Sequence, residues 1–242
     1  MRLIPLFTLL VLLALSGCST TTVKPTEEQA ADELYVRAKA SLDRGDYETA
    51  ITAFETLEIR YPFGQYAQQA QLEIAYAYYK FGEAESAIAT IDRFIKNNPG
   101  SSHLDYASYL RGLVNFNRGD SITSRLSRKD PSDGDTGALR DAFNDFTRLV
   151  KRYPDSQYSE DAKKRLIHLH NQMAKYEINV AHYYVKRRAY IAAANRARYV
   201  IENYQRTPAV KEALKILVRA YQKMDMQELA ADAQRVLETN ER

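Results

Sequence analysis

Apolar and small side chains recur along this chain at the three-to-four-residue spacing of helices, and one stretch shows how the helices pair. In the first helical segment these positions are Leu34, Ala38, Ser41 and Leu42. Gly45 then permits a tight turn, Ala50 lets two helices approach closely, and Phe54 fills the space one turn further on. Pro62 ends the second helix. The pattern predicts two antiparallel helices followed by a joint.

The same pattern returns further along the chain. Gly82 and Ala87 follow Gly45 and Ala50 at a distance of 37 residues, and Ala142 and Phe146 carry the pattern again before Pro154. A period in the thirties with this alanine, aromatic and proline order is the signature of tetratricopeptide repeats. We therefore expect an all-α protein, a right-handed superhelix of about five helix–turn–helix units and about ten helices.

The expected helices can be placed by their breaks. They cover residues 26–44, 47–60, 65–81, 84–97, 105–118, 138–153, 157–188, 190–204, 208–223 and 227–237. Thr207 should cap the ninth helix, with Pro208 at its first position. The segment 157–188 contains no proline or glycine, so it is one long helix or two with little break between them.

An insertion interrupts the third unit. Gly119 stands 23 residues before Ala142, so about 18 residues have been added, and residues 119–137 have the composition of a loop. This segment is either a tolerated surface loop or a docking loop. It divides the repeats into an N-terminal part, 26–118, and a C-terminal part, 138–242.

The first 17 residues have the features of a signal peptide: Arg2, an apolar run too short to span a bilayer, and small residues before Cys18. Leu15-Ser16-Gly17-Cys18 resembles the bacterial lipobox, in which the cysteine thiol receives a lipid. Cys18 is the one cysteine of the chain, so no intramolecular disulfide competes for it. We expect residues 18–25 to form a lipidated tether. By resemblance to sorted lipoproteins, Ser19 directs it to the outer membrane. A plain secretory signal is the alternative.

Charge is distributed unevenly between the two parts of the chain. Residues 26–118 carry 9 Lys and Arg against 14 Asp and Glu, whereas residues 139–206 carry 14 against 7. The basic residues that stand out are Lys163, Lys164, Arg165, Lys186, Arg187, Arg188, Arg196 and Arg198. An acidic protein partner or anionic membrane headgroups would explain them as well as nucleic acid does. A protein partner is ranked first, ordinary solvated helix faces second and nucleic acid third.

The first helix of each unit faces the concave side of a tetratricopeptide array, which allows the inner positions to be named. They are Tyr35 and Lys39, then Leu72, Tyr76, Tyr79 and Lys80, then Tyr106, Tyr109, Leu113 and Phe116. A single tyrosine here is more simply explained by packing. The whole set predicts a groove for an extended peptide, because tyrosine offers flat apolar area and a hydroxyl. Lys39 or Lys80 would meet a terminal carboxylate.

Catalytic chemistry is not predicted. His168 and His170 are two residues apart and point to different helix faces, and His103 is expected at the surface. The chain has no phosphate-binding glycine loop, dinucleotide fingerprint or nucleophile elbow. We assign no catalytic residue, no metal and no cofactor beyond the lipid on Cys18.

Several motifs together resemble the BamD family, the tetratricopeptide lipoproteins of the β-barrel assembly machinery that were formerly grouped with competence lipoproteins. They are Arg60-Tyr61-Pro62-Phe63-Gly64 with Tyr66, Gln68-Gln69, the run from Ala75 to Lys80, Ile91 to Ile95 with Asn98-Pro99, Asp105-Tyr106, Arg111-Gly112-Leu113, Tyr153-Pro154, Ser156-Gln157-Tyr158, Ala174 to Glu177, and Asn195-Arg196. The resemblance spans nearly the whole mature chain and is weakest in the last unit. Phe63 and Tyr66 either contact substrate or brace the joint, and bracing is favoured.

The resemblance implies a non-enzymatic, lipid-anchored subunit that faces the periplasm of a Gram-negative bacterium. Such a subunit recognises unfolded outer-membrane proteins and delivers them to BamA, alongside other Bam lipoproteins. It places substrate recognition in the N-terminal units and the contact with the BamA periplasmic domains in the C-terminal units, with Arg196 as a candidate for an ion pair. No nucleic acid is expected. The alternatives are a lipoprotein that binds DNA or peptidoglycan during uptake, and a generic periplasmic tetratricopeptide scaffold.

Overall fold

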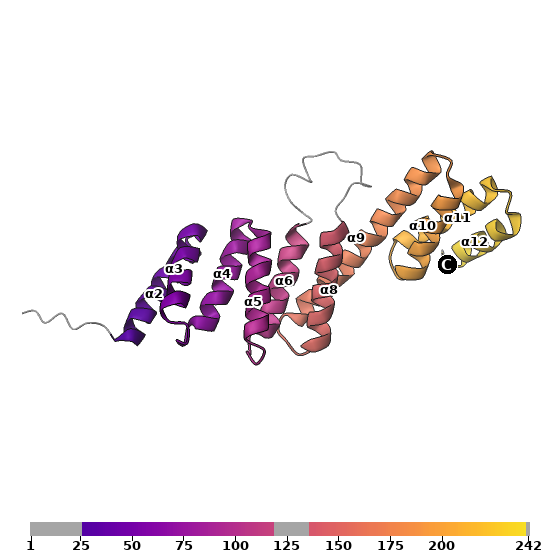
Figure 1. Ribbon diagram of the computed structural model, residues 1–242. Helices are drawn as coiled ribbons and strands as arrows, with labels where there is room; N and C mark the ends of the chain where they lie inside the picture. Colours follow the sequence, from indigo (N-terminus) through magenta and orange to yellow (C-terminus); the bar gives the residue numbers. More distant parts are fainter. Residues whose placement is uncertain (1–25, 119–135, 241–242) are drawn as a thin grey trace, which may run out of the picture.

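The computed structural model describes residues 26–118 and 136–240, and within these ranges it confirms an all-helical, tetratricopeptide-like fold (Figure 1). The described residues form ten α-helices: α2 (Glu27–Asp43), α3 (Tyr47–Arg60), α4 (Ala67–Phe81), α5 (Ala84–Asn97), α6 (Leu104–Arg118), α8 (Thr136–Arg152), α9 (Ser159–Lys186), α10 (Tyr190–Asn203), α11 (Ala209–Lys223) and α12 (Gln227–Thr239). The predicted signal peptide, the tether with Cys18, and residues 119–135 of the insertion lie outside the described residues.

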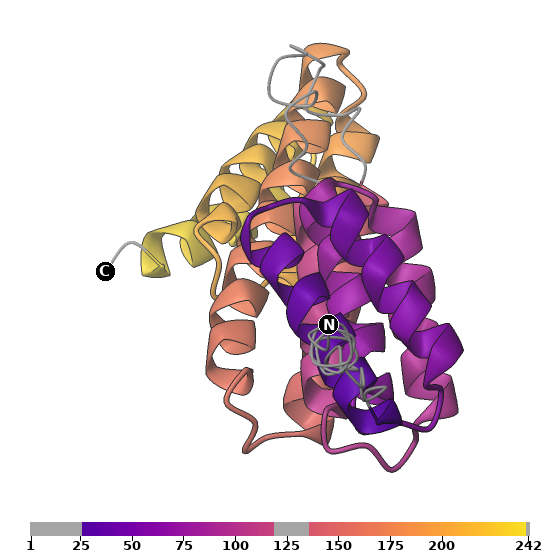
Figure 2. The same ribbon diagram turned by 90° about the vertical axis from the view of Figure 1, so that its left-hand side faces the viewer.

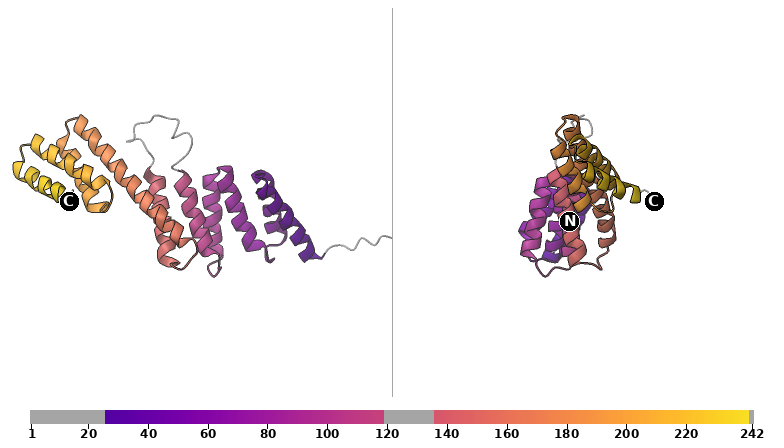
Figure 3. Two further views of the ribbon diagram at one scale, coloured as in Figure 1. Left: turned by 180° about the vertical axis from the view of Figure 1, so that it is seen from behind. Right: turned by 90° about the vertical axis from the view of Figure 1, so that its right-hand side faces the viewer.

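The helices pair in sequence order into five units: α2 with α3, α4 with α5, α6 with α8, α9 with α10, and α11 with α12. The units follow one another along an elongated body, which is seen from front and back in Figures 1 and 3. We call the first three units the N-terminal body and the last two the C-terminal body. Viewed from the N-terminal end, the C-terminal helices lie to one side of the first pair (Figure 2).

The turns inside units one, two, four and five use a left-handed residue at equivalent positions. Gly45 has φ 80° and Gly82 has φ 90°, as the sequence pattern requires. Arg188 and Asp225 occupy the same place in units four and five, each with φ 58°. These two are again 37 residues apart, so the repeat geometry persists there although the glycine does not.

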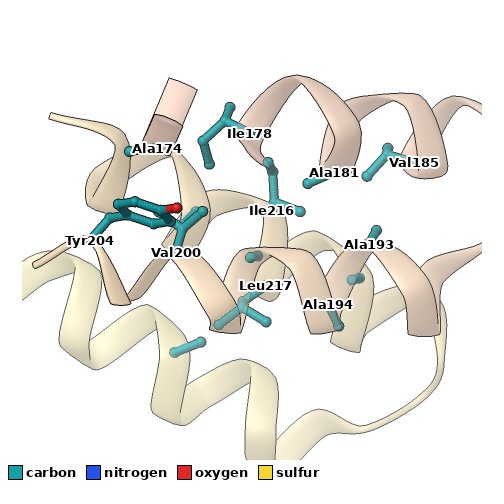
Figure 4. Packing of buried hydrophobic residues seen from close by; sticks show 14 of the residues in the cluster. Ala174, Ile178, Ala181, Val185, Ala193, Ala194, Val200, Tyr204, Ile216 and Leu217 are labelled. Atoms are coloured by element: carbon teal, nitrogen blue, oxygen red, sulfur yellow. The ribbon is translucent and has the colours of Figure 1, made fainter. Parts of the chain in front are cut away.

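The predicted close-packing positions form the cores of the units. Ala50, Ala87, Ala142 and Ala193 are all fully buried, as are the larger residues Phe54, Ile91 and Phe146 that follow them in units one to three. The C-terminal body has its own core, in which Ala174, Ile178 and Ala181 of α9 face Ala193 and Val200 of α10 (Figure 4). Alanine at these positions lets the helix backbones approach closely.

Each joint between units is held to the first helix of the preceding unit. Gln65 donates a hydrogen bond to Asp32 (3.1 Å), and Ser101 donates one to Gln68 (2.8 Å). Ser156 donates to Asp105 (2.6 Å) across the inserted unit. At the next joint the ring of His170 lies 3.3 Å from the carbonyl oxygen of Asn203. These contacts fix how one unit is oriented on the next.

Helix α9 settles the alternative left open for residues 157–188, because it is a single helix of 28 residues. Its N-terminal half contributes Ala162 and Leu169 to the core around Phe146, and its C-terminal half packs in the core of units four and five. As one continuous rod of the C-terminal body, it therefore also packs in the core of the N-terminal body and connects the two (Figure 1).

Most predicted helices begin or end one or two residues away from the observed ones, and two of these differences change a predicted feature. Helix α8 begins at Thr136, so the inserted loop ends before residue 136 rather than at 137. Thr207 does not cap α11. Its hydroxyl donates to the carbonyl oxygen of Tyr204 at 2.8 Å, and Pro208 takes the N-cap position before a helix that begins at Ala209.

Candidate functional site

An aromatic surface runs across the first helices of units one to three and continues to the start of α9. We call it the inner aromatic face, and its members are Tyr35, Tyr66, Tyr76, Tyr79, Tyr106, Tyr109, Phe116 and Tyr158. Tyr66 stacks on Tyr35 with ring centroids 4.4 Å apart, and Tyr76 lies 6.2 Å from Tyr79. Tyr158 joins unit three to α9, because its ring is 5.5 Å from Tyr106 and stacks on Tyr109 at 4.8 Å.

Glu73 of α4 provides the negative charge within this face. It accepts a hydrogen bond from Lys39 of α2 at 3.1 Å. Burial, together with the Glu73 carboxylate, raises the pKa of Tyr35 to about 12. Burial, the charge of Glu73 and the neighbouring tyrosines also raise the pKa of Tyr106. The phenols of Tyr35 and Tyr106 are therefore neutral hydrogen-bonding groups at physiological pH.

A second ion pair lies at the other end of the face, on α9. The Tyr109 hydroxyl donates to Asp161 at 2.7 Å, and Arg165 donates to the same carboxylate oxygen. The guanidinium of Arg165 also lies over the Phe116 ring, 5.0 Å from its centroid. Burial by itself would raise the pKa of Asp161, but hydrogen bonds from Arg165 and Tyr109 outweigh it and lower that pKa. The face thus has tyrosines in its middle and an ion pair toward each end.

The predicted groove residues are only partly brought together. Leu72 is a core residue, only 5% exposed, and offers no surface to a ligand. Lys39 is already paired with Glu73, whereas Lys80 is exposed. Tyr79 accepts a hydrogen bond from Asn117, and Leu113 packs against the core around Phe146. The tyrosines of α2, α4 and α6 are half-buried, so they serve packing and surface at once.

Of the two aromatic residues in the joint after α3, Tyr66 braces the joint and Phe63 does not. Tyr66 braces the joint through its stacking on Tyr35. Phe63 does not brace it, because its side chain is fully exposed at 101%. It borders a hollow of about 520 Å³ between the joint and the first turn of α2, lined among others by Glu27 and Arg60.

The predicted partner-facing cations have different surroundings in the C-terminal body. Arg187 lies over the ring of Tyr183, 5.5 Å from its centroid, next to the exposed Lys186 and Arg188. Arg198 forms a surface ion pair with Glu202 at 3.5 Å. Arg196 is engaged within its own chain, since it donates to the buried Glu177 at 2.9 Å. The cluster 163–165 is divided as well, with Lys163 beside Glu160 and Arg165 beside Asp161.

Sequence reasoning did not assign four residues to the inner aromatic face: Glu73, Tyr158, Asp161 and Arg165. It named Arg165 only as a basic residue of the C-terminal part and Tyr158 only within a family motif. Glu73 lies one turn before Tyr76 and Tyr158 lies in a joint, so neither stood at a position counted as inner-facing. Asp161 and Arg165 were hidden by the insertion, which breaks the register used to name such positions. Among residues 26–118 and 136–240 the side chains form no cluster of three metal ligands. No helix in these ranges is long and apolar enough to cross a membrane.

Comparison with known proteins gives one consistent result. A family model described as outer membrane lipoprotein, YfiO, matches residues 27–237. Among relatives called outer membrane protein assembly factor BamD, that of Neisseria meningitidis serogroup B (strain MC58) is 46% identical over 94% of this chain and 87% of its own length. Those of Xylella fastidiosa (strain Temecula1) and Vibrio cholerae (strain N16961) are 39% and 36% identical, over 98% and 96% of this chain and 82% and 96% of their own lengths. The chain therefore belongs to the YfiO/BamD family of outer membrane lipoproteins.

Proposed function

We propose that this protein is a non-enzymatic subunit of the machinery that assembles outer-membrane proteins. The inner aromatic face carries the proposal on the structural side, since a row of tyrosines across three units suits an extended polypeptide better than a small substrate. The assembly-factor names of the relatives support the biological setting.

The face recognises unfolded outer-membrane protein segments. The rings of Tyr76 and Tyr106 offer flat area to apolar side chains, and their hydroxyls serve the peptide backbone. The pairs Lys39–Glu73 and Asp161–Arg165 meet polar or charged side chains toward the ends of the bound segment. Phe63 extends the apolar surface beyond unit one.

The C-terminal body binds the machinery itself. Its exposed cations, Lys186, Arg187, Arg188, Arg196 and Arg198, form the surface for BamA periplasmic domains, and other Bam lipoproteins join the complex. A lipid on Cys18 anchors the chain to the outer membrane, facing the periplasm. The lipid is the sole covalent group that this function needs.

The assignment is tested by depletion and by capture. Depleting the protein lowers the amount of folded outer-membrane barrels, and a crosslinking pull-down from membranes recovers BamA. Normal barrel levels together with recovery of unrelated complexes would refute the proposal. DNA binding at physiological salt, with a steep salt dependence, would favour the uptake alternative.

The peptide face is tested with a synthetic peptide of the C-terminal strand of an outer-membrane barrel protein from the same bacterium. Tyr76→Ala combined with Tyr79→Ala weakens binding about tenfold, because two ring contacts are lost. Tyr183→Ala, an equally large change at an exposed tyrosine of α9 in the C-terminal body, leaves the affinity unchanged. Equal affinity of the double variant and the wild type would refute the role of the face.

A further inference from the structure

Glu177 is a carboxylate inside the C-terminal core. It is 4% exposed, and its neighbours on α9 include the buried Ala174 and Ile178. Burying an ionised carboxylate is unfavourable unless a partner compensates the charge. The partner is Arg196 of α10, whose Nη1 lies 2.9 Å from Glu177 Oε2.

Arg196 is only partly used by this contact. Its side chain is 44% exposed, and the pair with Glu177 engages one guanidinium nitrogen. In the part of the chain that the structure describes, no other acceptor is hydrogen-bonded to this guanidinium. The remaining N–H groups are therefore free for an acceptor outside the chain, while the buried edge is fixed.

The other cations of this body are held differently. Arg198 pairs with Glu202, whose side chain is 61% exposed, and such surface pairs restrain an arginine weakly. Arg187 rests on Tyr183 at the end of α9. Arg196 alone among these is oriented by a carboxylate that solvent does not reach. A side chain that is already ordered loses less entropy when a partner binds it.

We infer that Glu177 is a positioning residue, which holds the guanidinium of Arg196 ready for a carboxylate on an acidic protein partner. The inference rests on the proposed function, since the acidic partner is the surface that the C-terminal body binds. Arg196 makes the contact itself, and Glu177 acts only through Arg196. The pair is then both an internal contact between α9 and α10 and half of an interface.

A double-mutant cycle tests the inference with the purified periplasmic domains of BamA as the probe. Arg196→Gln weakens binding about tenfold, and Glu177→Gln weakens it about fivefold although the cation remains. The double variant binds as weakly as Arg196→Gln alone, because Glu177 has no route to the partner except through Arg196. A purely structural role of Glu177 would instead persist in the Arg196→Gln background.

Glu202→Gln is the matched control. It removes one negative charge next to the same surface, but from an exposed carboxylate, so it leaves the affinity within about twofold of the wild type. Circular dichroism confirms that every variant is folded. Equal affinity of Glu177→Gln and Glu202→Gln would overturn the inference while leaving the proposed function in place. Absence of binding by the wild type would overturn both.

Discussion

The two bodies each bury one carboxylate, and the two carboxylates are surrounded in opposite ways. Among the described residues, Asp145 and Glu177 are the charged side chains in the buried class, at 3% and 4% exposure. Asp145 of α8 accepts hydrogen bonds from Arg111 and from Asn115, both on α6. Glu177 accepts from Arg196, which is half in solvent.

The arginines show the difference most clearly. Arg111 is 24% exposed, and it is shared between Asp145 and Asp92 of α5, the latter at 2.8 Å. Its donors are therefore directed at its own chain, and the cluster ties together α5, α6 and α8 on either side of the insertion. Arg196 has one internal partner and an open edge. A closed cluster of this kind stabilises the fold, whereas an open pair can be completed by another molecule.

The largest expected effect comes from breaking the closed cluster. Asp145→Asn removes the buried one of the two carboxylates that pair with the half-buried Arg111, and the free energy of unfolding falls by about 3 kcal/mol. Urea denaturation followed by circular dichroism measures this. Asp141→Asn, an exposed position on the same helix, is the control and changes stability by less than about 0.5 kcal/mol. Equal midpoints for the two variants would show that the cluster does not hold α6 to α8.

Adding a methyl group to the interface between α6 and α8 has a smaller expected effect on the free energy of unfolding. A Cβ at Gly112 would lie 2.5 Å from the ring of the fully buried Phe146. Overpacking outweighs the better helix propensity of alanine, so Gly112→Ala lowers the free energy of unfolding by about 1 kcal/mol. Gly100→Ala, where nothing lies within 4 Å, is neutral in the same denaturation experiment. A variant as stable as the wild type would mean that α6 and α8 separate easily.

The sequence predicted the helices well because the same turn and packing positions recur in several repeats. Gly45 with Ala50 and Gly82 with Ala87 set the same turn and the same close approach, so the errors are confined to boundaries such as Thr136. The site was harder to predict. Whether an inner position is core, as Leu72 is, or surface depends on the unit packed against it. Glu177 and Arg196 lie on different helices. The spacing of residues within either helix does not predict that these two side chains pair.

The smallest effect is spectroscopic and reports on the open pair directly. Burial, then Tyr199 and the charge of Glu177, raise the pKa of Tyr204 to about 12. Glu177→Gln removes that charge and lowers the pKa of Tyr204, whereas Asp145→Asn leaves it unchanged. An ultraviolet titration of the phenols, with Tyr204→Phe to identify the signal, measures the difference.

The raised pKa of Tyr204 also predicts how the stability of the fold changes with pH. The ordinary phenol pKa of about 10 applies to the unfolded chain, so between pH 10 and 12 the folded chain keeps a proton on Tyr204 that the unfolded chain has lost. The folded state therefore loses stability as the pH rises through this window, and Tyr204→Phe or Glu177→Gln reduces the loss. Asp145→Asn has no such effect, because Tyr204 does not depend on that carboxylate. If the wild type and Glu177→Gln lose the same stability between pH 10 and 12, the Glu177 carboxylate and the Tyr204 phenol are not coupled.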